Sequence, residues 1–102
     1  MKLIEVNMNM GRQMELNNTP PVEYTQELYN HIFKKFRRNG EWTMPESFQK
    51  TGQFETYSMH RVYLAYPVTY VKVVGDHLRV ERMQPTSSGD VTTIKWYKIE
   101  RR

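Results

Sequence analysis

The sequence predicts a small α+β domain, in which an N-terminal β-hairpin and one amphipathic helix precede an antiparallel sheet of three or four strands. Three observations predict this fold. A chain of 102 residues has the usual size of one domain. Residues 20–39 repeat apolar side chains every three or four positions, which is typical of a helix. Residues 61–99 are rich in β-branched and aromatic residues, which is typical of strands.

Residues 4–10 alternate apolar and polar side chains, a period of two that predicts a half-buried strand. Its apolar members are Ile4, Val6, Met8 and Met10. A three-residue turn ending at Gln13 would pair Met10 with Met14 and Met8 with Leu16. We therefore expect a β-hairpin over residues 1–16.

A helix is expected over residues 20–39, with Thr19 as the N-cap and Pro20 in the first turn. Asn39-Gly40 would end it. Its apolar stripe comprises Leu28, Tyr29, Ile32, Phe33 and Phe36. The basic residues near its end, Lys34, Lys35, Arg37 and Arg38, complement the helix dipole, and the alternative is a phosphate contact.

Residues 41–58 form a connector with no sustained period, but with many large apolar side chains. These are Trp42, Met44, Phe48, Phe54 and Tyr57. A short helical turn is expected from Thr43–Glu46 to Gly52. The apolar content indicates a connector that packs over the edge of the core, and the alternative is exposure for a partner.

A second hairpin is centred on Gly75-Asp76, where two β-branched runs meet. Gly at the first central position suits a type II′ turn, which would pair Val74 with His77 and Val71 with Val80. One face of this hairpin is then apolar and belongs in the core: Val71, Val73, Leu78 and Val80. We expect it to pack against Leu28, Ile32 and Phe36.

The other face of this hairpin places Lys72 opposite Arg79, beside Tyr70, His77 and Glu81. Like charges in a cross-strand pair destabilise a sheet, so this face favours an anionic neighbour. The full predicted contact surface is Tyr70, Lys72, His77, Arg79, Glu81, Arg82, Lys95 and Trp96.

The end of the chain predicts a turn at residues 85–90 and a last strand from Val91 to Ile99. Its alternation slips at Trp96-Tyr97, as a bulge or a strand buried on both faces would allow. Pro67 indicates that residues 62–66 and 68–74 are either two strands or one bent edge strand.

Charge is concentrated in the sheet-forming half, because residues 61–102 contain eight Lys and Arg against four Asp and Glu. Such a half attracts polyanions, although many small domains carry as much charge for solubility. The chain has no cysteine, and we recognise neither a signal peptide nor a membrane span. We therefore expect an intracellular protein, in the host cytoplasm if it is encoded by a phage.

The common catalytic motifs are absent, and the histidines, His31, His60 and His77, have no metal-ligand spacing. We expect no cofactor, metal site or enzymatic activity. A metal-independent ribonuclease is the enzymatic alternative. His60 or Glu55 would act as its base, Arg61 or Arg79 would stabilise charge, and His77 would be its acid.

The sequence thus favours a binding protein whose basic and aromatic sheet face engages nucleic acid or an acidic protein surface. With nucleic acid, Tyr63, Tyr66, Tyr70 or Trp96 would stack on bases. The alternative is a stoichiometric inhibitor or accessory protein, of the phage-encoded kind, that acts by protein contact.

Overall fold

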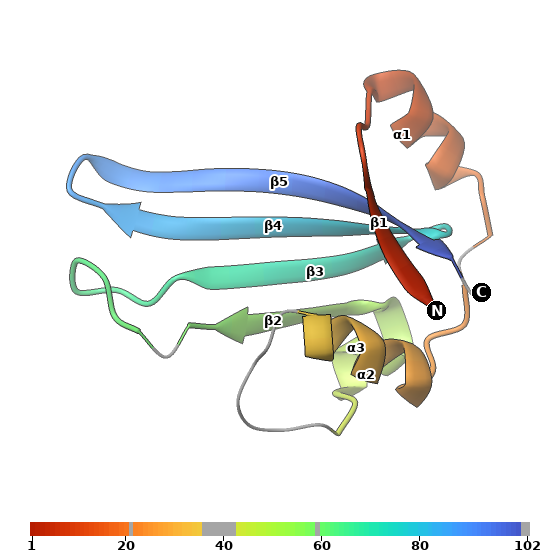
Figure 1. Cartoon of the computed structure of the whole chain (residues 1–102), viewed down its shortest axis with the longest axis horizontal. Helices are drawn as coiled ribbons and strands as arrows, with labels where there is room; N and C mark the ends of the chain where they lie inside the picture. Colours follow the sequence, from red (N-terminus) through yellow and green to blue (C-terminus); the bar gives the residue numbers. More distant parts are fainter. Residues whose placement is uncertain (21, 36–42, 59, 101–102) are drawn as a thin grey trace.

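The computed structural model describes residues 1–20, 22–35, 43–58 and 60–100. Its strands are β1 (Lys2–Val6), β2 (Gln53–Tyr57), β3 (Val68–Val74), β4 (His77–Thr86) and β5 (Gly89–Glu100), and its helices are α1 (Met10–Asn17), α2 (Gln26–Lys35) and α3 (Glu46–Thr51). The strands form one antiparallel sheet in the order β1-β5-β4-β3-β2 (Figure 1). The predicted α+β class is confirmed, and the described sheet has five strands where three or four were expected.

The β3–β4 hairpin has the predicted register, with Val74 opposite His77 and Val71 opposite Val80. Gly75 has φ 61°, as the first central residue of a type II′ turn requires. A side chain here would also crowd α1, because a Cβ atom would lie 3.3 Å from the carbonyl oxygen of Leu16. Glycine at this position therefore serves both the turn and the packing of α1 against it.

The strand register sorts side chains onto two faces of the sheet. The core face carries Phe54, Val71, Val73, Leu78, Val80, Tyr97 and Ile99, all buried. We call the opposite side the outer face; one cross-strand row on it is Val6, Trp96, Arg79, Lys72 and Gln53, and the next is Ile94, Glu81, Tyr70 and Glu55. The predicted core assignment of the hairpin is confirmed.

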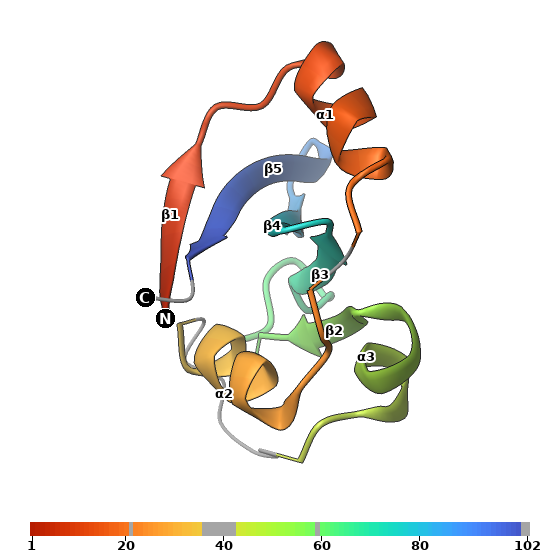
Figure 2. The ribbon, with the colours of Figure 1, turned by 90° about the vertical axis from the view of Figure 1, so that its right-hand side faces the viewer.

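Helix α2 packs on the core face, within the curve of the sheet, whereas α1 lies on the other side (Figure 2). Leu28 and Ile32 are 0% exposed, as predicted. The predicted start of the helix is wrong, because the hydroxyl of Thr25 accepts from Leu28 N at 3.1 Å and caps a helix that begins at Gln26. Phe36 and the predicted end at residue 39 lie outside the described residues.

The predicted N-terminal hairpin is wrong, since β1 pairs with β5 and residues 10–17 are helical. The side chain of Asn9 accepts from Arg12 N at 2.9 Å and so caps α1. Thr19, the predicted N-cap of the next helix, instead donates its hydroxyl to the carbonyl oxygen of Glu15 at 3.0 Å. The alternation of this segment therefore predicts a strand correctly only as far as Val6. Beyond it, the cap at Asn9 favours a helix.

The connector packs into the core, as predicted. Helix α3 ends at Thr51 and is capped by Gly52, which has a φ of 69°. Phe48 is 0% exposed and its ring meets those of Tyr29 and Phe54 at 5.5 and 5.7 Å. The prediction missed β2, an edge strand in which Phe54 is the one buried residue. Trp42 lies outside the described residues.

Strand β5 resolves the slip in alternation at Trp96-Tyr97. Both residues are buried, at 9% and 8% exposed, and the pairing with β4 continues without interruption through them. The strand is therefore buried on both faces there, and the bulge alternative is wrong. The predicted turn at residues 85–90 is confirmed between Thr86 and Gly89, and β3 begins just after Pro67.

Candidate functional site

The cation pair predicted from the sequence lies at the centre of the outer face. Lys72 on β3 is directly opposite Arg79 on β4, and Trp96 on β5 continues the row. Lys72 is exposed, the Arg79 side chain is 33% exposed, and Trp96 is buried. Two like charges therefore share a partly open surface in the same row as the buried Trp96.

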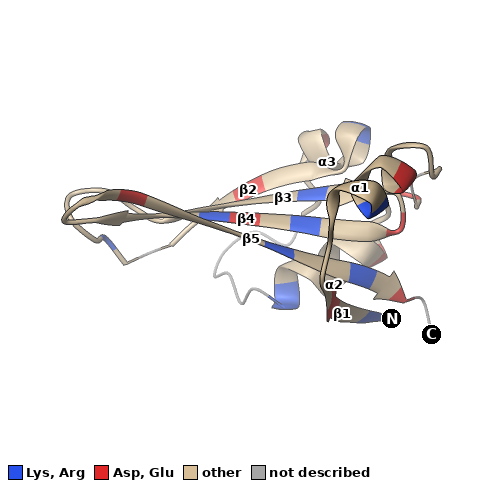
Figure 3. Cartoon of the chain, turned by 90° about the horizontal axis from the view of Figure 1, so that it is seen from above, with Lys and Arg blue, Asp and Glu red and all other residues tan. Residues whose placement is uncertain are grey.

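Acidic and aromatic side chains form the adjacent row. Tyr70, 40% exposed, lies between Glu81 on β4 and Glu55 on β2. The guanidinium of Arg79 lies 3.4 Å from the carboxylate of Glu81, a long contact for an ion pair. Among the described residues, no acidic side chain forms an ion pair with Lys72. Acidic and basic residues both occur along β4 (Figure 3), and the strand register places Glu81 and Glu55 in the row next to Lys72 and Arg79, so the outer face is not uniformly basic.

Two hollows lie on either side of Arg79. One, of about 390 Å³, is lined by Tyr70, Lys72, Arg79, Glu81, Glu55 and residues of α3 and β2. The other, of about 450 Å³, lies between β5 and the segment that joins β1 to α1, and its lining includes Met8, Gln13, Arg79 and Trp96. Arg79 is thus accessible from both sides, and Trp96 contributes to the second hollow despite its burial.

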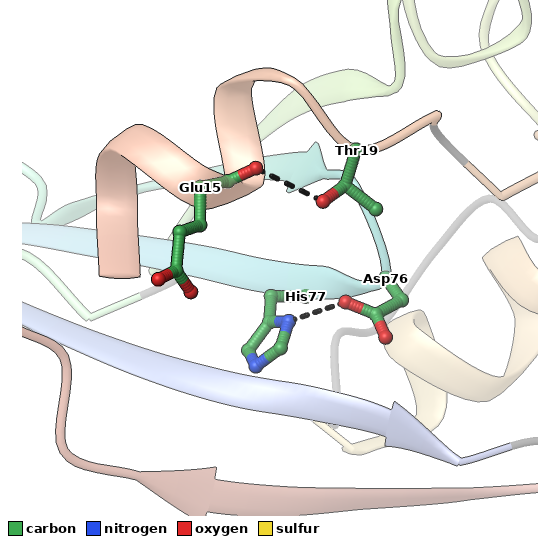
Figure 4. Close-up of polar contacts among 4 residues, drawn as sticks. All are labelled: Glu15, Thr19, Asp76 and His77. Carbon is green, nitrogen blue, oxygen red and sulfur yellow. Dashed lines mark hydrogen bonds and ion pairs between the residues drawn. The ribbon is translucent and has the colours of Figure 1, made fainter. Parts of the chain in front are cut away.

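His77 does not contribute to an open contact surface, although it shares the parity of Lys72 and Arg79. It is 6% exposed at the start of β4, close to α1, as Figure 4 shows. Its Nδ1 atom lies 2.7 Å from a carboxylate oxygen of Asp76, and its buried Nε2 atom has no hydrogen-bond partner. The prediction of an exposed His77 is therefore wrong, because α1, which the sequence did not reveal, lies beside this turn.

Arg82 and Lys95 are not brought together with the cation pair. Their register partners, Thr69 and Val80, belong to the opposite parity, so both point away from the outer face. Lys95 lies 4.0 Å from Glu5, and both side chains are more than 60% exposed. The structure thus gathers Tyr70, Lys72, Arg79, Glu81 and Trp96 on one face and separates Arg82 and Lys95 from them.

One aromatic side chain of the outer face was missing from the predicted site. Tyr57 on β2 is 54% exposed, and its hydroxyl donates to Glu55 at 3.0 Å. This hydrogen bond raises the pKa of Tyr57 above its usual value. The sequence signal was the alternation of Phe54 and Thr56 with Glu55 and Tyr57, which is weak because only one of the four is strongly apolar.

Tyr63 and Tyr66 lie in the segment between β2 and β3 and not on a strand. They are 64% and 51% exposed. A stack of bases running from Tyr70 and Trp96 to these two residues would have to leave the sheet surface at Val68. The predicted aromatic platform is therefore divided between the sheet and this loop.

The structure gathers only some of the residues considered for ribonuclease chemistry: Glu55 and Arg79 line one hollow, whereas the predicted acid, His77, is buried. His60 precedes β3 and His77 follows it, and the seven residues of this strand span about 20 Å. An acid and a base at opposite ends of a strand cannot act on one phosphodiester. In the part of the chain that the structure describes, no three His, Asp or Glu side chains gather as a candidate metal site.

Comparisons of the chain with protein-family models, with curated proteins and with solved structures give no match. No described helix is long and apolar enough to cross a membrane.

Proposed function

We propose that this chain is a non-enzymatic binding protein that engages an acidic patch on another protein through the outer face of its sheet. The observation that carries the proposal is the in-register pair of Lys72 and Arg79 beside exposed Tyr70. Like charges directly opposite one another destabilise a sheet, so an acidic partner would turn an unfavourable pair into a favourable contact. Tyr and Arg are also the side chains most enriched at binding hot spots.

The adjacent carboxylates favour a protein over a nucleic acid as the partner. Glu55 and Glu81 flank Tyr70 and line the same hollow as Lys72 and Arg79. A phosphate backbone lying along this face would be repelled by both carboxylates, and its bases would have to stack on Tyr70 between them. A protein surface presents charges of both signs and can match adjoining basic and acidic rows.

A stoichiometric inhibitor or accessory protein, including one encoded by a phage, would be a particular case of this function. Support comes from a contact face that is placed on the strands β2, β3 and β4. Sites built on strands hold their side chains more rigidly than sites on loops, which reduces the entropy lost on binding.

A pull-down from a lysate of the source cells, run with and without nuclease, tests the proposal. We expect one predominant protein partner that survives nuclease and is lost with the Lys72→Gln/Arg79→Gln variant. A partner set that disappears with nuclease would identify nucleic acid as the ligand. A partner that the double variant retains at wild-type level would place the contact elsewhere and contradict the proposal.

A further inference from the structure

The segment between β2 and β3 ends in a tight turn with two bulky apolar residues at its tip. Val62 and Ala65 close this turn through reciprocal backbone hydrogen bonds of 2.8 and 3.0 Å. The two central residues, Tyr63 and Leu64, have φ values of 46° and 67°. Two positive φ angles at the central positions are those of a type I′ turn, for which Asn-Gly is the preferred sequence.

Tyrosine and leucine are unfavourable in this conformation. A Cβ atom at positive φ approaches the following carbonyl oxygen, and glycine, asparagine and aspartate tolerate the region far better than a large side chain does. Among the described residues, Tyr63 and Leu64 are the two non-glycine residues with positive φ. Strained residues of this kind gather at ligand-contact sites, so the turn calls for an explanation beyond folding.

Burial within the chain does not offset the strain. Leu64 is 84% exposed and Tyr63 is 64% exposed, and Tyr66 beside them is 51% exposed. The tip projects from the end of the sheet (Figure 1). An exposed leucine is ordinary by itself, but here two neighbouring apolar residues are both exposed and held in a strained conformation, as is found at ligand-contact sites.

The tip is also ordered from within the chain. The guanidinium of Arg61 donates to the carbonyl oxygen of Leu64 at 3.2 Å, and Ser58 N donates to the carbonyl oxygen of Pro67 at 2.9 Å at the base of the loop. These contacts fix the direction in which Leu64 points before any partner arrives. Pre-organisation of this kind lowers the entropy lost on binding.

We propose that the Tyr63-Leu64 turn is an apolar anchor that inserts into a hydrophobic pocket of a protein partner whose rim is acidic. Arg61 stands beside the anchor and is exposed, so it meets such a rim as the anchor enters. This inference rests on the proposed function in one respect, namely that the partner is a protein. It adds an anchor that is separate from the outer face.

A membrane surface is the less favoured occupant of this tip. The β4–β5 turn projects from the same end of the sheet (Figure 1), and its residues Ser87 and Ser88 are polar and exposed. A bilayer approaching the tip would therefore meet this polar turn as well. Insertion of one leucine and one or two tyrosines beside a single arginine also gives a weak membrane anchor.

The experiment combines site-specific cross-linking with a turn that keeps the fold. The full chain carries the photoreactive residue p-benzoylphenylalanine in place of Leu64. In a parallel sample it replaces Met10, which is 77% exposed against 84% for Leu64. After irradiation in a lysate of the source cells, we expect a discrete protein adduct from position 64 and none from position 10. Excess wild-type chain should suppress the adduct at least tenfold, whereas excess Tyr63→Asn/Leu64→Gly should not. This variant should also melt at a higher temperature than the wild type, which shows that its loss of competition is not unfolding.

Two results would overturn the inference. The first is a cross-linking result: either no adduct forms at position 64, or the Tyr63→Asn/Leu64→Gly variant suppresses the adduct as strongly as the wild-type chain does. The other is wild-type co-sedimentation with phosphatidylcholine vesicles that the variant abolishes, which would make the tip a membrane element. The two proposals fail separately, because Lys72→Gln/Arg79→Gln keeps the anchor and Tyr63→Asn/Leu64→Gly keeps the outer face.

Discussion

The strained turn at Tyr63-Leu64 makes a prediction about stability that needs no partner. Replacing both residues with Asn-Gly should stabilise the folded chain, although it removes two apolar side chains. The left-handed conformation costs an ordinary residue roughly 1–2 kcal/mol, and both central residues adopt it. Asn-Gly avoids most of that strain, because these are the residues that type I′ turns favour.

Two smaller terms oppose the gain. Glycine increases the entropy of the unfolded chain, which offsets about 0.5–1 kcal/mol. The substitution also removes the covered part of the two apolar side chains. This part is small, because Leu64 and Tyr63 are already 84% and 64% exposed, so its loss offsets a further amount of similar size. The net expectation is an increase of about 1 kcal/mol in the free energy of unfolding.

Urea denaturation followed by circular dichroism measures this change. We expect a higher midpoint at an unchanged slope, and a melting temperature raised by about 4–8 °C for a chain of this size. Val91→Asn is the control, because Val91 is an apolar residue that is 50% exposed but lies in the regular strand β5. The control should be neutral or destabilising. An Asn-Gly variant that is no more stable than the wild type would show that the turn is unstrained, and would remove the main premise of the anchor.

Three further predictions concern the core, the hairpin turn and the single helix histidine. Val80→Ala should lower the free energy of unfolding by about 1–3 kcal/mol in urea titrations, because Val80 is 7% exposed in the core; a neutral result would contradict the assigned face. Gly75→Ala should cost at least about 1 kcal/mol by the same assay, since φ is 61° and the new Cβ would lie 3.2 Å from that of Thr19; an unchanged midpoint would mean that α1 does not pack there. Burial, together with nearby positive charges that include Lys34 and Lys35, lowers the pKa of His31, so the neutral ring is favoured in the fold. The stabilising contribution of neutral His31 is present above the unfolded-state pKa and is lost as the pH falls through the folded-state pKa. The free energy of unfolding should therefore decline less between about pH 7.5 and pH 5 in His31→Gln than in the wild type. Identical pH profiles would refute this.

The β3–β4 hairpin was predictable because all of its information is local. Gly75 specifies the turn, and the alternation of valines with charged residues specifies the face. The register that follows from this turn places Lys72 opposite Arg79, which is the pairing observed. The same locality explains the success with the apolar stripe of α2 and with the turn after Thr86.

The N-terminal segment could not be predicted in the same way. Its alternation was real as far as Val6, but the partner of β1 is β5, more than 80 residues away in the chain. No local pattern records such a pairing. Asn9 carried a capping signal for α1, and it was outweighed by the alternation that runs from Ile4 to Met10 on both sides of it.

The candidate site was predicted only in part for related reasons. Parity within one hairpin is local, which is why Tyr70, Lys72, Arg79 and Glu81 fall together. Extending the site to β5 needed the β4–β5 register, which places Lys95 opposite Val80 and so on the other face. The burial of His77 depends on α1, a helix in a segment whose alternation predicted a strand.

The most direct test of the central claim compares two pairs of substitutions that remove the same charge from opposite sides of the sheet. Lys72→Gln/Arg79→Gln alters the outer face, and Arg82→Gln/Lys95→Gln alters strands β4 and β5 on the other side. Affinity for the captured partner is measured for both variants by isothermal titration calorimetry. The first pair should weaken binding by about 1–3 kcal/mol, roughly 5-fold to 150-fold in Kd, and the second pair should change it little. Equal losses from both pairs would show that net charge alone attracts the partner, and a larger loss from the second pair would place the contact on the opposite face.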